Sequence, residues 1–457
     1  MSVPAHIFRE YDVRGVVDTD LRPDLVESLG RALGTAYRRE GATRIGVARD
    51  VRPSGVELRD HLVRGLRSTG CDVVDYGAAP TGAFYHAQAT GEEQAGVVIT
   101  GSHNPPEFNG FKLVLHGGSF FGEQIQGLRR LIESEDYETG KGSLGERDVL
   151  GPYVEDVRSK VSIGRPVRFA YDSGNGAASL VAARLFEALG QEPIALFDEP
   201  DGSFPNHHPD PTIPEYLKDL TRRVLDDGLE FGVAYDGDAD RIGVIDDRGE
   251  ILWGDRLLVL FARDLLERQP GATVIHDVKC SQTLTDAVTA AGGEAMIWKT
   301  GHSLIKQKMK ETGASLAGEM SGHLFLGENW YGFDDALFAT VRLLEIVARH
   351  DRPLSELLSD VPTLHATPEI RVDCPDAVKF EVVDRVREHF RRQAPIVDID
   401  GVRVTFEDGW GLVRASNTQP ALVVRVEAGD AETLVAYRDR VEDAIARARA
   451  EVEGSGA

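Results

Sequence analysis

Residues 44–50, RIGVARD, hold the pattern that decides the fold: a run of mostly apolar side chains that ends in a loop with an aspartate. Leu58, Leu62 and Leu66 follow at helical spacing, so they share one face of an amphipathic helix. Gly70 ends this helix, and a second apolar run begins after it. The stretch therefore predicts a strand, a helix and a further strand.

The same unit recurs twice farther along the chain. VRFAYD at residues 167–172 precedes a helix that ends at Gly190, and TVIHD at residues 273–277 precedes one that ends near Gly292. Alternation of strand and helix favours right-handed crossovers and sheets covered by helices. We therefore predict three related α/β domains with mixed sheets flanked by helices.

The pattern changes after a proline-containing break at residues 363–368. Beyond this break come EIRVDC, a helical segment, GVRVTF, GLVRAS, ALVVRVEA and a final helical segment. This order predicts a C-terminal α+β domain with an antiparallel sheet. The four expected domains are residues 1–148, 149–252, 253–365 and 366–457.

Acidic residues outnumber basic ones by 75 to 51, which gives the 457-residue chain a formal charge of -24. This balance argues against a general role on nucleic acid or on an anionic membrane surface. A ligand that carries phosphate would have to be held by local clusters of Arg and Lys against the global field. We expect a small-molecule ligand and a monomer or small homo-oligomer.

The three cysteines, Cys71, Cys280 and Cys374, are odd in number and far apart in the chain. They fit neither a disulfide framework nor a zinc site, so they favour a reducing compartment. The start, MSVPAHIFREYD, contains no apolar stretch of signal length, and the run Leu257 to Ala262 is too short to span a bilayer. The expected location is the cytoplasm.

Each α/β unit also has a later strand that ends in a polar, glycine-bearing loop. The three pairs of strand and loop are GVVIT with GSHNP, FGVAY with DGDADR, and ASLA with GEMSGH. Ligands of α/β sheets bind beyond the carboxyl ends of the strands. We therefore expect the three loops to converge on one interdomain cleft, and loops on different faces of the molecule would contradict this.

The loop TGSHNP contains a serine that is suited to nucleophilic chemistry. Ser102 follows a buried strand on a tight turn, where we expect it to be exposed and rigidly placed, and His103 offers proton transfer near neutral pH. Lys112 lies on the next strand and could neutralise a phosphate. The alternative is that Ser102 caps the start of a helix. A hydrolase is disfavoured because no Gly-x-Ser-x-Gly elbow is present.

The loop DGDADR places carboxylates at alternate positions, Asp236, Asp238 and Asp240. When the backbone curls, all three can face one ion, and such hard oxygen ligands favour magnesium or calcium. An EF-hand is a poor fit, because Arg241 and Asp247 stand where its glycine and glutamate belong. The alternative is a solvated acidic turn, in which the carboxylates would repel one another.

Two further loops carry polar groups that suit a sugar phosphate. In GEMSGH, Glu319 and Ser321 point the same way in an extended backbone and could bind neighbouring sugar hydroxyls, although any exposed loop can hold such residues. RASNTQP clusters donors that suit a phosphate dianion, and a polar hairpin turn is its alternative interpretation. The donors of RASNTQP are Arg414, Ser416, Asn417 and Thr418.

The four signatures TGSHNP, DGDADR, GEMSGH and RASNTQP together resemble those of the α-D-phosphohexomutase family, in the family order and across nearly the whole chain. The resemblance is strongest to the bacterial phosphomannomutase/phosphoglucomutase branch. It implies that Ser102 is phosphorylated and that the three aspartates hold Mg²⁺ together with an oxygen on Ser102. Two departures are Ala239 and Ala48, which stand where relatives have glycine.

The resemblance also implies roles for residues around this centre. Arg241 would lie beside the metal, His103 and Lys112 would assist proton transfer or stabilise charge, and His302 in KTGHS would be a second acid/base candidate. The general base stays open. The residues expected to bind substrate are Tyr11 and Arg14 in FREYDVRG, Glu319 and Ser321 for sugar hydroxyls, and Arg414, Ser416, Asn417 and Thr418 for the phosphate that does not react.

The implied reaction interconverts hexose 1-phosphate and hexose 6-phosphate through a hexose 1,6-bisphosphate, which serves as intermediate and activator. Met320 in GEMSGH resembles the glucose and mannose branch, so these sugars are favoured. Phosphoglucosamine mutase, from the same family, is the closest alternative.

Two alternatives come from other classes of protein. Residues 140–145, GKGSLG, fit G-x-G-x-x-G literally, but they follow a polar stretch and lead to Pro152, which disfavours a dinucleotide-binding oxidoreductase. A noncatalytic sugar- or metal-binding module would explain DGDADR, but it leaves Ser102 and the Arg414 loop without a role.

Overall fold

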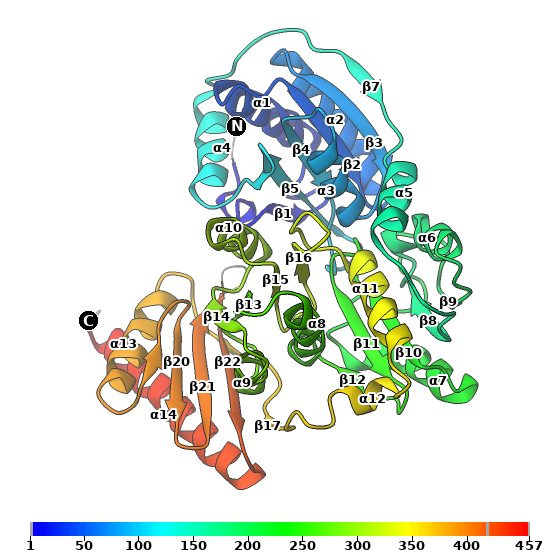
Figure 1. The fold of residues 1–457 in the computed structure, drawn as a ribbon. Coiled ribbons are helices and arrows are strands. Elements are labelled where there is room, and N and C mark those ends of the chain that lie inside the picture. The colour runs from blue at the N-terminus through cyan, green and yellow to red at the C-terminus, as the bar shows by residue number, and fades with distance from the viewer. Residues whose placement is uncertain (1–2, 417–419, 456–457) are drawn as a thin grey trace.

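The computed structural model describes residues 3–416 and 420–455 and contains four β-sheets, each with its own helices (Figure 1). The first sheet has the order β1-β5-β4-β2-β3-β7, with β6 beside β5. Strands β3 and β4 run parallel to β2, whereas β5 runs antiparallel to β4, so the sheet is mixed. Its elements are η1 (Ala5–Ile7), β1 (Val13–Val16), α1 (Pro23–Arg39), β2 (Arg44–Arg49), α2 (Ser54–Ser68), β3 (Asp72–Ala78), α3 (Thr81–Thr90), β4 (Ala95–Ile99), β5 (Phe108–Leu115), β6 (Gly118–Ser119), α4 (Glu123–Ser134) and β7 (Leu144–Glu146).

The second sheet has the order β12-β11-β10-β8-β9 and is also mixed. The helix predicted to end at Gly190 is α6, which ends at Ala188 and follows the 3₁₀ helix η2. The elements are α5 (Leu150–Lys160), β8 (Phe169–Asp172), η2 (Ala177–Leu180), α6 (Ala182–Ala188), β9 (Ile194–Leu196), η3 (Pro214–Leu217), α7 (Lys218–Asp227), β10 (Phe231–Tyr235), β11 (Ile242–Asp246) and β12 (Ile251–Leu252).

The third sheet has the order β14-β13-β15-β16, in which only the β15–β16 pair is antiparallel. Helix α11 is buried along much of its length and begins at Asp335, whose side chain accepts the amide N–H of Phe338. The elements are α8 (Gly254–Arg268), β13 (Thr273–Asp277), α9 (Gln282–Ala290), β14 (Glu294–Trp298), α10 (His302–Thr312), β15 (Leu316–Gly318), β16 (Leu324–Leu326), α11 (Ala336–Arg349) and α12 (Leu354–Leu357).

The three mixed sheets share one strand order. Each contains the path β5-β4-β2-β3, β11-β10-β8-β9 or β16-β15-β13-β14, in which the first strand is antiparallel to the second and the others are parallel. The TGSHNP, DGDADR and GEMSGH loops each connect the first two strands of these paths. The three loops therefore occupy the same topological position, at the carboxyl end of a parallel strand.

The fourth sheet is antiparallel throughout and carries helices α13 and α14 on one face (Figure 1). The predicted fold class, three α/β units with mixed sheets and a C-terminal α+β unit, is therefore confirmed. The elements are β17 (His365–Ala366), β18 (Ile370–Asp373), α13 (Lys379–Arg391), β19 (Ile396–Val397), β20 (Val402–Phe406), β21 (Gly409–Ala415), β22 (Ala421–Ala428) and α14 (Ala431–Ser455).

The buried apolar residues join the first three sheets more closely than the fourth. One continuous cluster contains Phe84 of α3, Phe169 of β8 and Leu258 of α8. The fourth sheet has a separate core with its two helices, and a small cluster in which Trp410 meets Val278 connects it to the third. The loops at the junctions of the first three sheets are therefore held against one another by packing.

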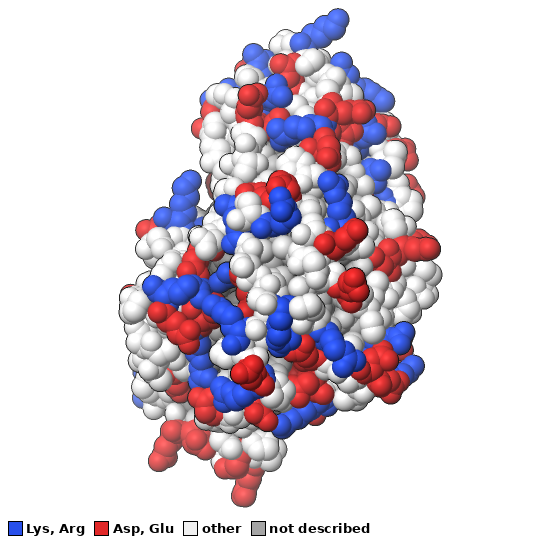
Figure 2. All heavy atoms as spheres, turned by 45° about the vertical axis from the view of Figure 1, so that its right-hand side comes forward, with Lys and Arg blue, Asp and Glu red and all other residues white. Residues whose placement is uncertain are grey.

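All three cysteines are buried and free, in agreement with the expectation that they form no disulfide. Among the described residues, no helix combines the length and the apolar character that a membrane crossing requires. Figure 2 shows acidic and basic side chains interleaved over the face that it displays. On that face the net charge of -24 is therefore not gathered into a single patch.

Candidate functional site

Ser102 lies in the connection between β4 and β5, and strand rather than helix follows it. A role as a helix cap is therefore excluded. Its backbone has a φ of 48°, a left-handed conformation that strains residues other than glycine. Its hydroxyl donates to Asp236 Oδ2 at 2.8 Å and lies 3.1 Å from His103 Nδ1.

The expectation that Ser102 is exposed is wrong, since only 3% of the residue is accessible. The DGDADR loop packs directly against the backbone of Ser102. The packing is so close that a Cβ on Gly237 would lie 2.3 Å from the Ser102 carbonyl oxygen. The serine is covered because the first and second sheets bring their loops together. The sequence expectation treated the turn in isolation.

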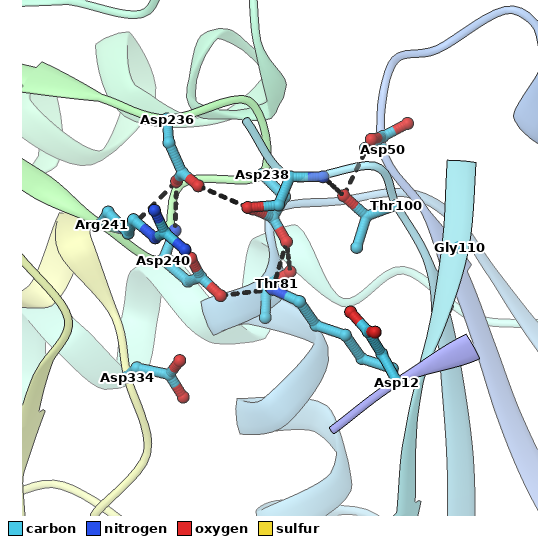
Figure 3. A network of polar contacts seen from close by, with 12 residues as sticks. Asp12, Asp50, Thr81, Thr100, Gly110, Asp236, Asp238, Asp240, Arg241 and Asp334 are labelled. Atoms are coloured by element: carbon cyan, nitrogen blue, oxygen red, sulfur yellow. Dashed lines mark hydrogen bonds and ion pairs between the residues drawn. The ribbon is translucent and has the colours of Figure 1, made fainter. Parts of the chain in front are cut away.

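Asp236, Asp238 and Asp240 are fully buried, and one carboxylate oxygen of each lies within 4.8 Å of the others (Figure 3). Burial raises the pKa of Asp236 well above its usual value, and repulsion from Asp240 and Asp238 raises it further. Asp238 Oδ1 and Asp240 Oδ1 have no hydrogen-bond partner among the described residues. Buried, mutually repelling oxygens of this kind fit a hard divalent cation, so a solvated acidic turn is excluded.

Lys112 of β5 forms ion pairs with two of the three aspartates. Its ammonium nitrogen lies 2.6 Å from Asp238 Oδ2 and also contacts Asp240 Oδ2. Burial by itself would lower the pKa of Lys112, but the two aspartates hold this pKa well above its usual value. The lysine is therefore a permanent cation that binds one oxygen of each carboxylate and leaves the other oxygen available.

The DGDADR loop adopts a strained turn that contacts with neighbouring segments stabilise. Ala239 has a φ of 59°, so alanine takes the left-handed conformation here without glycine. Its carbonyl oxygen accepts the amide N–H of Ala336, the first residue of α11, at 3.2 Å. Thr81 donates its amide N–H to the Asp238 carbonyl and its hydroxyl to Asp238 Oδ2. The loop is thus fixed from both the first and third sheets.

Arg241 connects the metal loop to the GEMSGH loop. Its Nε–H donates to His323 Nε2 at 2.9 Å, so the proton of a neutral His323 must be on Nδ1, which lies 3.0 Å from Asp334 Oδ2. Lys306 binds the other oxygen of Asp334 at 2.8 Å. Asp240, His323 and Asp334 could geometrically form a second metal group, but a protonated Nδ1 cannot be a ligand.

His302, at the start of α10, lies beside these groups. Its ring stacks on His323 with a centroid separation of 5.7 Å and meets Tyr11 edge-on at 6.2 Å. Burial lowers the pKa of His302 well below its usual value, and the Lys306 ammonium lowers it further. His302 Nδ1 is buried without a hydrogen-bond partner among the described residues. It is therefore a neutral base with an unused nitrogen.

Glu319 and Ser321 lie together, as their spacing predicted. The Ser321 hydroxyl donates to Glu319 Oε2 at 3.1 Å, and Glu319 Oε1 accepts the amide N–H of Gly301 at 3.0 Å. The carboxylate is buried and connects the GEMSGH loop to the KTGHS loop. Both side chains thus share one small region of the third sheet.

The C-terminal sheet reaches the site through Asp400. Arg414 donates to Asp400 Oδ2 at 3.0 Å, and the same oxygen accepts the amide N–H of Thr300 at 3.1 Å. Ser416 follows on the same segment and is buried. Asn417 and Thr418 lie outside the described residues. Arg414 is therefore joined to the KTGHS loop through Asp400.

The N-terminal segment contributes Tyr11 and Arg14. The Tyr11 hydroxyl donates to the Thr300 carbonyl at 2.8 Å. Arg14, on β1, donates to Asn104 Oδ1 at 2.6 Å and to Asp12 Oδ2 at 2.5 Å. Tyr11 therefore connects the first sheet with the third, and Arg14 is held beside the Ser102 loop.

The three predicted loops are in contact, so they do not lie on different faces of the molecule. Ser102 meets Asp236, and Arg241 meets His323. Sequence reasoning missed several charged residues that complete the network. These are Asp50, Arg52, Lys306 and Asp334, and Lys279, whose buried ammonium pairs with Glu369. For Asp50, the sequence feature that could have indicated a role in the site is its position directly after a parallel strand.

The GKGSLG segment does not form a dinucleotide site. Gly140 and Gly142 donate their amide N–H groups to backbone carbonyls of Ser68 and Arg67, and the segment leads into the short edge strand β7. No helix begins there within the described residues, so the phosphate-binding helix start that such a motif needs is absent.

Comparison with known families covers almost the entire chain. Four domain families of phosphoglucomutase/phosphomannomutase match in order: domain I at residues 5–139, domain II at 151–249, domain III at 253–364 and the C-terminal domain at 369–444.

Individual relatives agree with these matches. The chain is 46% identical to the phosphomannomutase/phosphoglucomutase of Pseudomonas aeruginosa over 95% of its own length and 94% of the relative's. It is 44% identical to a phosphoglucomutase of Neisseria gonorrhoeae, with 97% of each chain covered. A crystal structure of a phosphoglucomutase/phosphomannomutase family protein from Burkholderia thailandensis superposes with a TM-score of 0.93 at 45% identity, covering 98% of each chain.

Proposed function

Since this chain belongs to the phosphoglucomutase/phosphomannomutase family, we propose that it interconverts hexose 1-phosphates and hexose 6-phosphates through a phosphoserine at Ser102. The supporting observation is the 2.8 Å contact between the Ser102 hydroxyl and Asp236, within a buried group of three carboxylates. A noncatalytic sugar- or metal-binding module would not need a strained serine at this position.

The reaction balances as two opposite phosphoryl transfers. In the first, the P–O bond to Ser102 Oγ breaks while the sugar hydroxyl oxygen forms a P–O bond to the same phosphorus; the hydroxyl proton passes to a base, and Ser102 Oγ takes up a proton. The resulting hexose 1,6-bisphosphate then reorients in the site. In the second transfer Ser102 Oγ loses its proton and accepts the other phosphoryl group, while the sugar oxygen that is released takes up a proton.

The cation proposed for the carboxylate group is Mg²⁺, which Asp236, Asp238, Asp240 and an oxygen on Ser102 would hold. When bound, it would neutralise negative charge on the phosphoryl group. Lys112 and Arg241 supply fixed positive charge beside it, because their pKa values lie above the usual range despite burial.

Two histidines are candidates for moving the proton. Burial lowers the pKa of His103 and of His302 well below the usual value, and neighbouring cations lower both further. Both rings are therefore neutral near pH 7 and can accept a proton. His103 lies beside the Ser102 hydroxyl, whereas His302 has the unused Nδ1. We keep both as candidates for the general base.

Substrate binding is assigned to the groups that surround this centre. Glu319 and Ser321 offer acceptors and a donor for sugar hydroxyls, and Arg414 offers a guanidinium for the distal phosphate. The complete proposed set is Tyr11, Arg14, Glu319, Ser321, Arg414, Ser416, Asn417 and Thr418. With the predicted domain limits at residues 148, 252 and 365, these residues would belong to the first, third and fourth domains.

Glucose and mannose phosphates are the proposed sugars. Met320 lies between the two substrate residues of the GEMSGH loop, and its Sδ atom contacts Arg425 of the C-terminal sheet. Its thioether sulfur is only a weak hydrogen-bond acceptor, so it is a poor partner for the protonated amino group of an amino sugar. We propose a cytoplasmic enzyme that acts as a monomer or small homo-oligomer.

A substrate panel tests the function. Purified protein with Mg²⁺ and glucose 1,6-bisphosphate is assayed on the 1-phosphates of mannose, glucose and glucosamine. The readout is formation of the corresponding sugar 6-phosphate. We expect turnover of mannose and glucose phosphates and an intact mass that includes phosphate on Ser102. A clear preference for the amino sugar would assign the chain to phosphoglucosamine mutase, and no turnover of any of the three would reject the mutase.

A further inference from the structure

Arg52 is a fully buried arginine beneath the Ser102 loop. It stands in the segment after β2, and none of its side chain is accessible to solvent. Placing a guanidinium in such a position is costly unless each of its N–H groups has an acceptor. The acceptors of Arg52 therefore identify the segment that its side chain stabilises.

All five N–H groups of the Arg52 side chain find acceptors around the Ser102 loop. Nε donates to Asp50 Oδ2 at 3.2 Å, and the four remaining N–H groups go to backbone carbonyls. These carbonyls belong to Ser102 at 2.9 Å, Asn104 at 2.5 Å, Pro105 at 2.7 Å and Phe108 at 3.1 Å. One planar group thus fixes four carbonyls between Ser102 and the start of β5.

Asp50 fixes the other side of the loop. Its carboxylate accepts the Arg52 amide at 2.9 Å, the Thr100 hydroxyl at 2.9 Å and the Gly101 amide at 3.2 Å. The Thr100 oxygen in turn accepts the amide N–H of Ser102 at 2.8 Å. Ser102 therefore has its amide held through Asp50 and its carbonyl held by Arg52.

The packing leaves no room for the loop to shift toward the arginine. A Cβ on Gly101 would lie 2.6 Å from Arg52 Cζ. The centroid of the Phe204 ring lies 5.0 Å from the same Cζ atom, in a cation–π contact. The left-handed φ of Ser102 is unfavourable for a residue with a side chain and persists only where the surroundings impose it. The contacts of Arg52 and Asp50 are the surroundings that do so.

We propose that Arg52, together with Asp50, is a positioning residue that sets the direction of the Ser102 Oγ atom toward the metal group. Its donors bind main-chain carbonyls and Asp50 and touch no reacting atom. This inference rests on the proposed phosphoserine function. It predicts an effect on phosphoryl transfer, because the sugar and distal phosphate are bound by other elements, and so it predicts a loss in kcat with little change in KM.

Arg52→Lys tests the proposal, because lysine keeps the charge but cannot bind four carbonyls in one plane. We expect kcat to fall about 10²-fold, since small misplacement of a reacting group has effects of that size, with KM nearly unchanged. The matched control is Arg342→Lys, another buried arginine, whose partners Glu345 and Asp264 belong to α11 and α8. This control should lower the melting temperature and keep kcat.

Wild-type kcat in Arg52→Lys, or an equal kcat loss in Arg342→Lys, would overturn the proposal. If Arg52→Lys does not fold, Thr100→Val provides a milder test, because it removes only the hydroxyl between Asp50 and the Ser102 amide. Its kcat should fall with KM retained, and an unchanged kcat would also overturn the proposal. An inactive wild-type enzyme would instead reject the phosphoserine function itself.

Discussion

Ser102 Oγ lies 2.8 Å from Asp236 Oδ2, although 134 residues separate the two positions in the chain. The contact joins the loop of the first sheet to the loop of the second. It brings the oxygen that we propose as the nucleophile to the edge of a buried carboxylate group, where a phosphate on that oxygen would meet the proposed cation. The reactivity of the serine therefore depends on how two sheets pack, as well as on its own loop.

Ser102→Ala should abolish turnover while leaving the fold intact. Alanine removes the oxygen that carries the phosphoryl group, and the small side chain still fits the buried turn. We expect a loss of about 10³-fold or more in kcat/KM, since removing a covalent nucleophile has effects of at least this size. A coupled assay measures the loss, and circular dichroism checks the fold. Activity near the wild-type level would refute the phosphoserine assignment.

Magnesium should both activate and stabilise the protein. A divalent ion relieves the repulsion that raises the pKa of Asp236, and at a concentration 100 times its Kd it stabilises the folded state by about 2.7 kcal/mol. Chelation with EDTA should remove activity, and added Mg²⁺ should raise the melting temperature. Asp238→Asn should lose this shift. Asp75→Asn, a buried aspartate of the first sheet, should keep it, and a shift retained in Asp238→Asn would contradict the site.

Asp334→Asn should lower kcat by disturbing His323. Asp334 lies 3.0 Å from His323 Nδ1, and His323 Nε2 accepts from Arg241. Without the carboxylate beside Nδ1, the His323 tautomer that accepts the Arg241 Nε–H is less favoured, and we expect kcat to fall about 10-fold, because a polar contact to a charged group contributes about 1.5–3 kcal/mol. Steady-state kinetics measure kcat. Asp360→Asn, at an exposed pair with Arg263, serves as the control and should have no effect, and equal kcat in the two variants would exclude this role.

Folding stability should depend on pH through Asp335. Burial raises the pKa of this carboxyl to about 7, although the Phe338 amide and the Tyr153 hydroxyl favour its charged form. The folded state then binds the proton more tightly than the unfolded chain does. The stabilising contribution is complete below about pH 4 and is lost as the pH rises through 7, with a slope of up to about 1.4 kcal/mol per pH unit.

Asp335→Asn removes this titration. Urea unfolding between pH 4 and 8 should therefore show a flatter stability profile for the variant than for the wild type. Identical profiles would show that the carboxyl does not take up a proton on folding.

The sequence predicted the repeated strand–helix–strand units, which follow from local patterns, and the contact between their loops, which follows from the carboxyl-end position that the loops share. RIGVARD, VRFAYD and TVIHD become β2, β8 and β13, each with a parallel neighbour on both sides. The alternating aspartates likewise form one group, since their spacing and the turn at Ala239 are local.

The residues that sequence reasoning missed act through contacts between distant segments. Asp334 has no motif around it, and its role appears only where the third sheet places it beside His323. Arg52 reads as part of a turn, although its partners come from a loop about 50 residues later. The burial of Ser102 was missed for the same reason, because the covering segment belongs to another sheet.

Because the three mixed sheets share one strand order, equivalent loops contribute different chemical groups to the site. Each copy of the motif supplies a different chemical part from the same hairpin: a hydroxyl, a set of anions, and an imidazole with its acceptors. This is the arrangement that duplication of one ancestral unit, followed by specialisation of its turn, would leave behind. A single copy excised from the chain would lack the complementary parts and would expose apolar surface of the core that the copies share, so turnover requires the copies together.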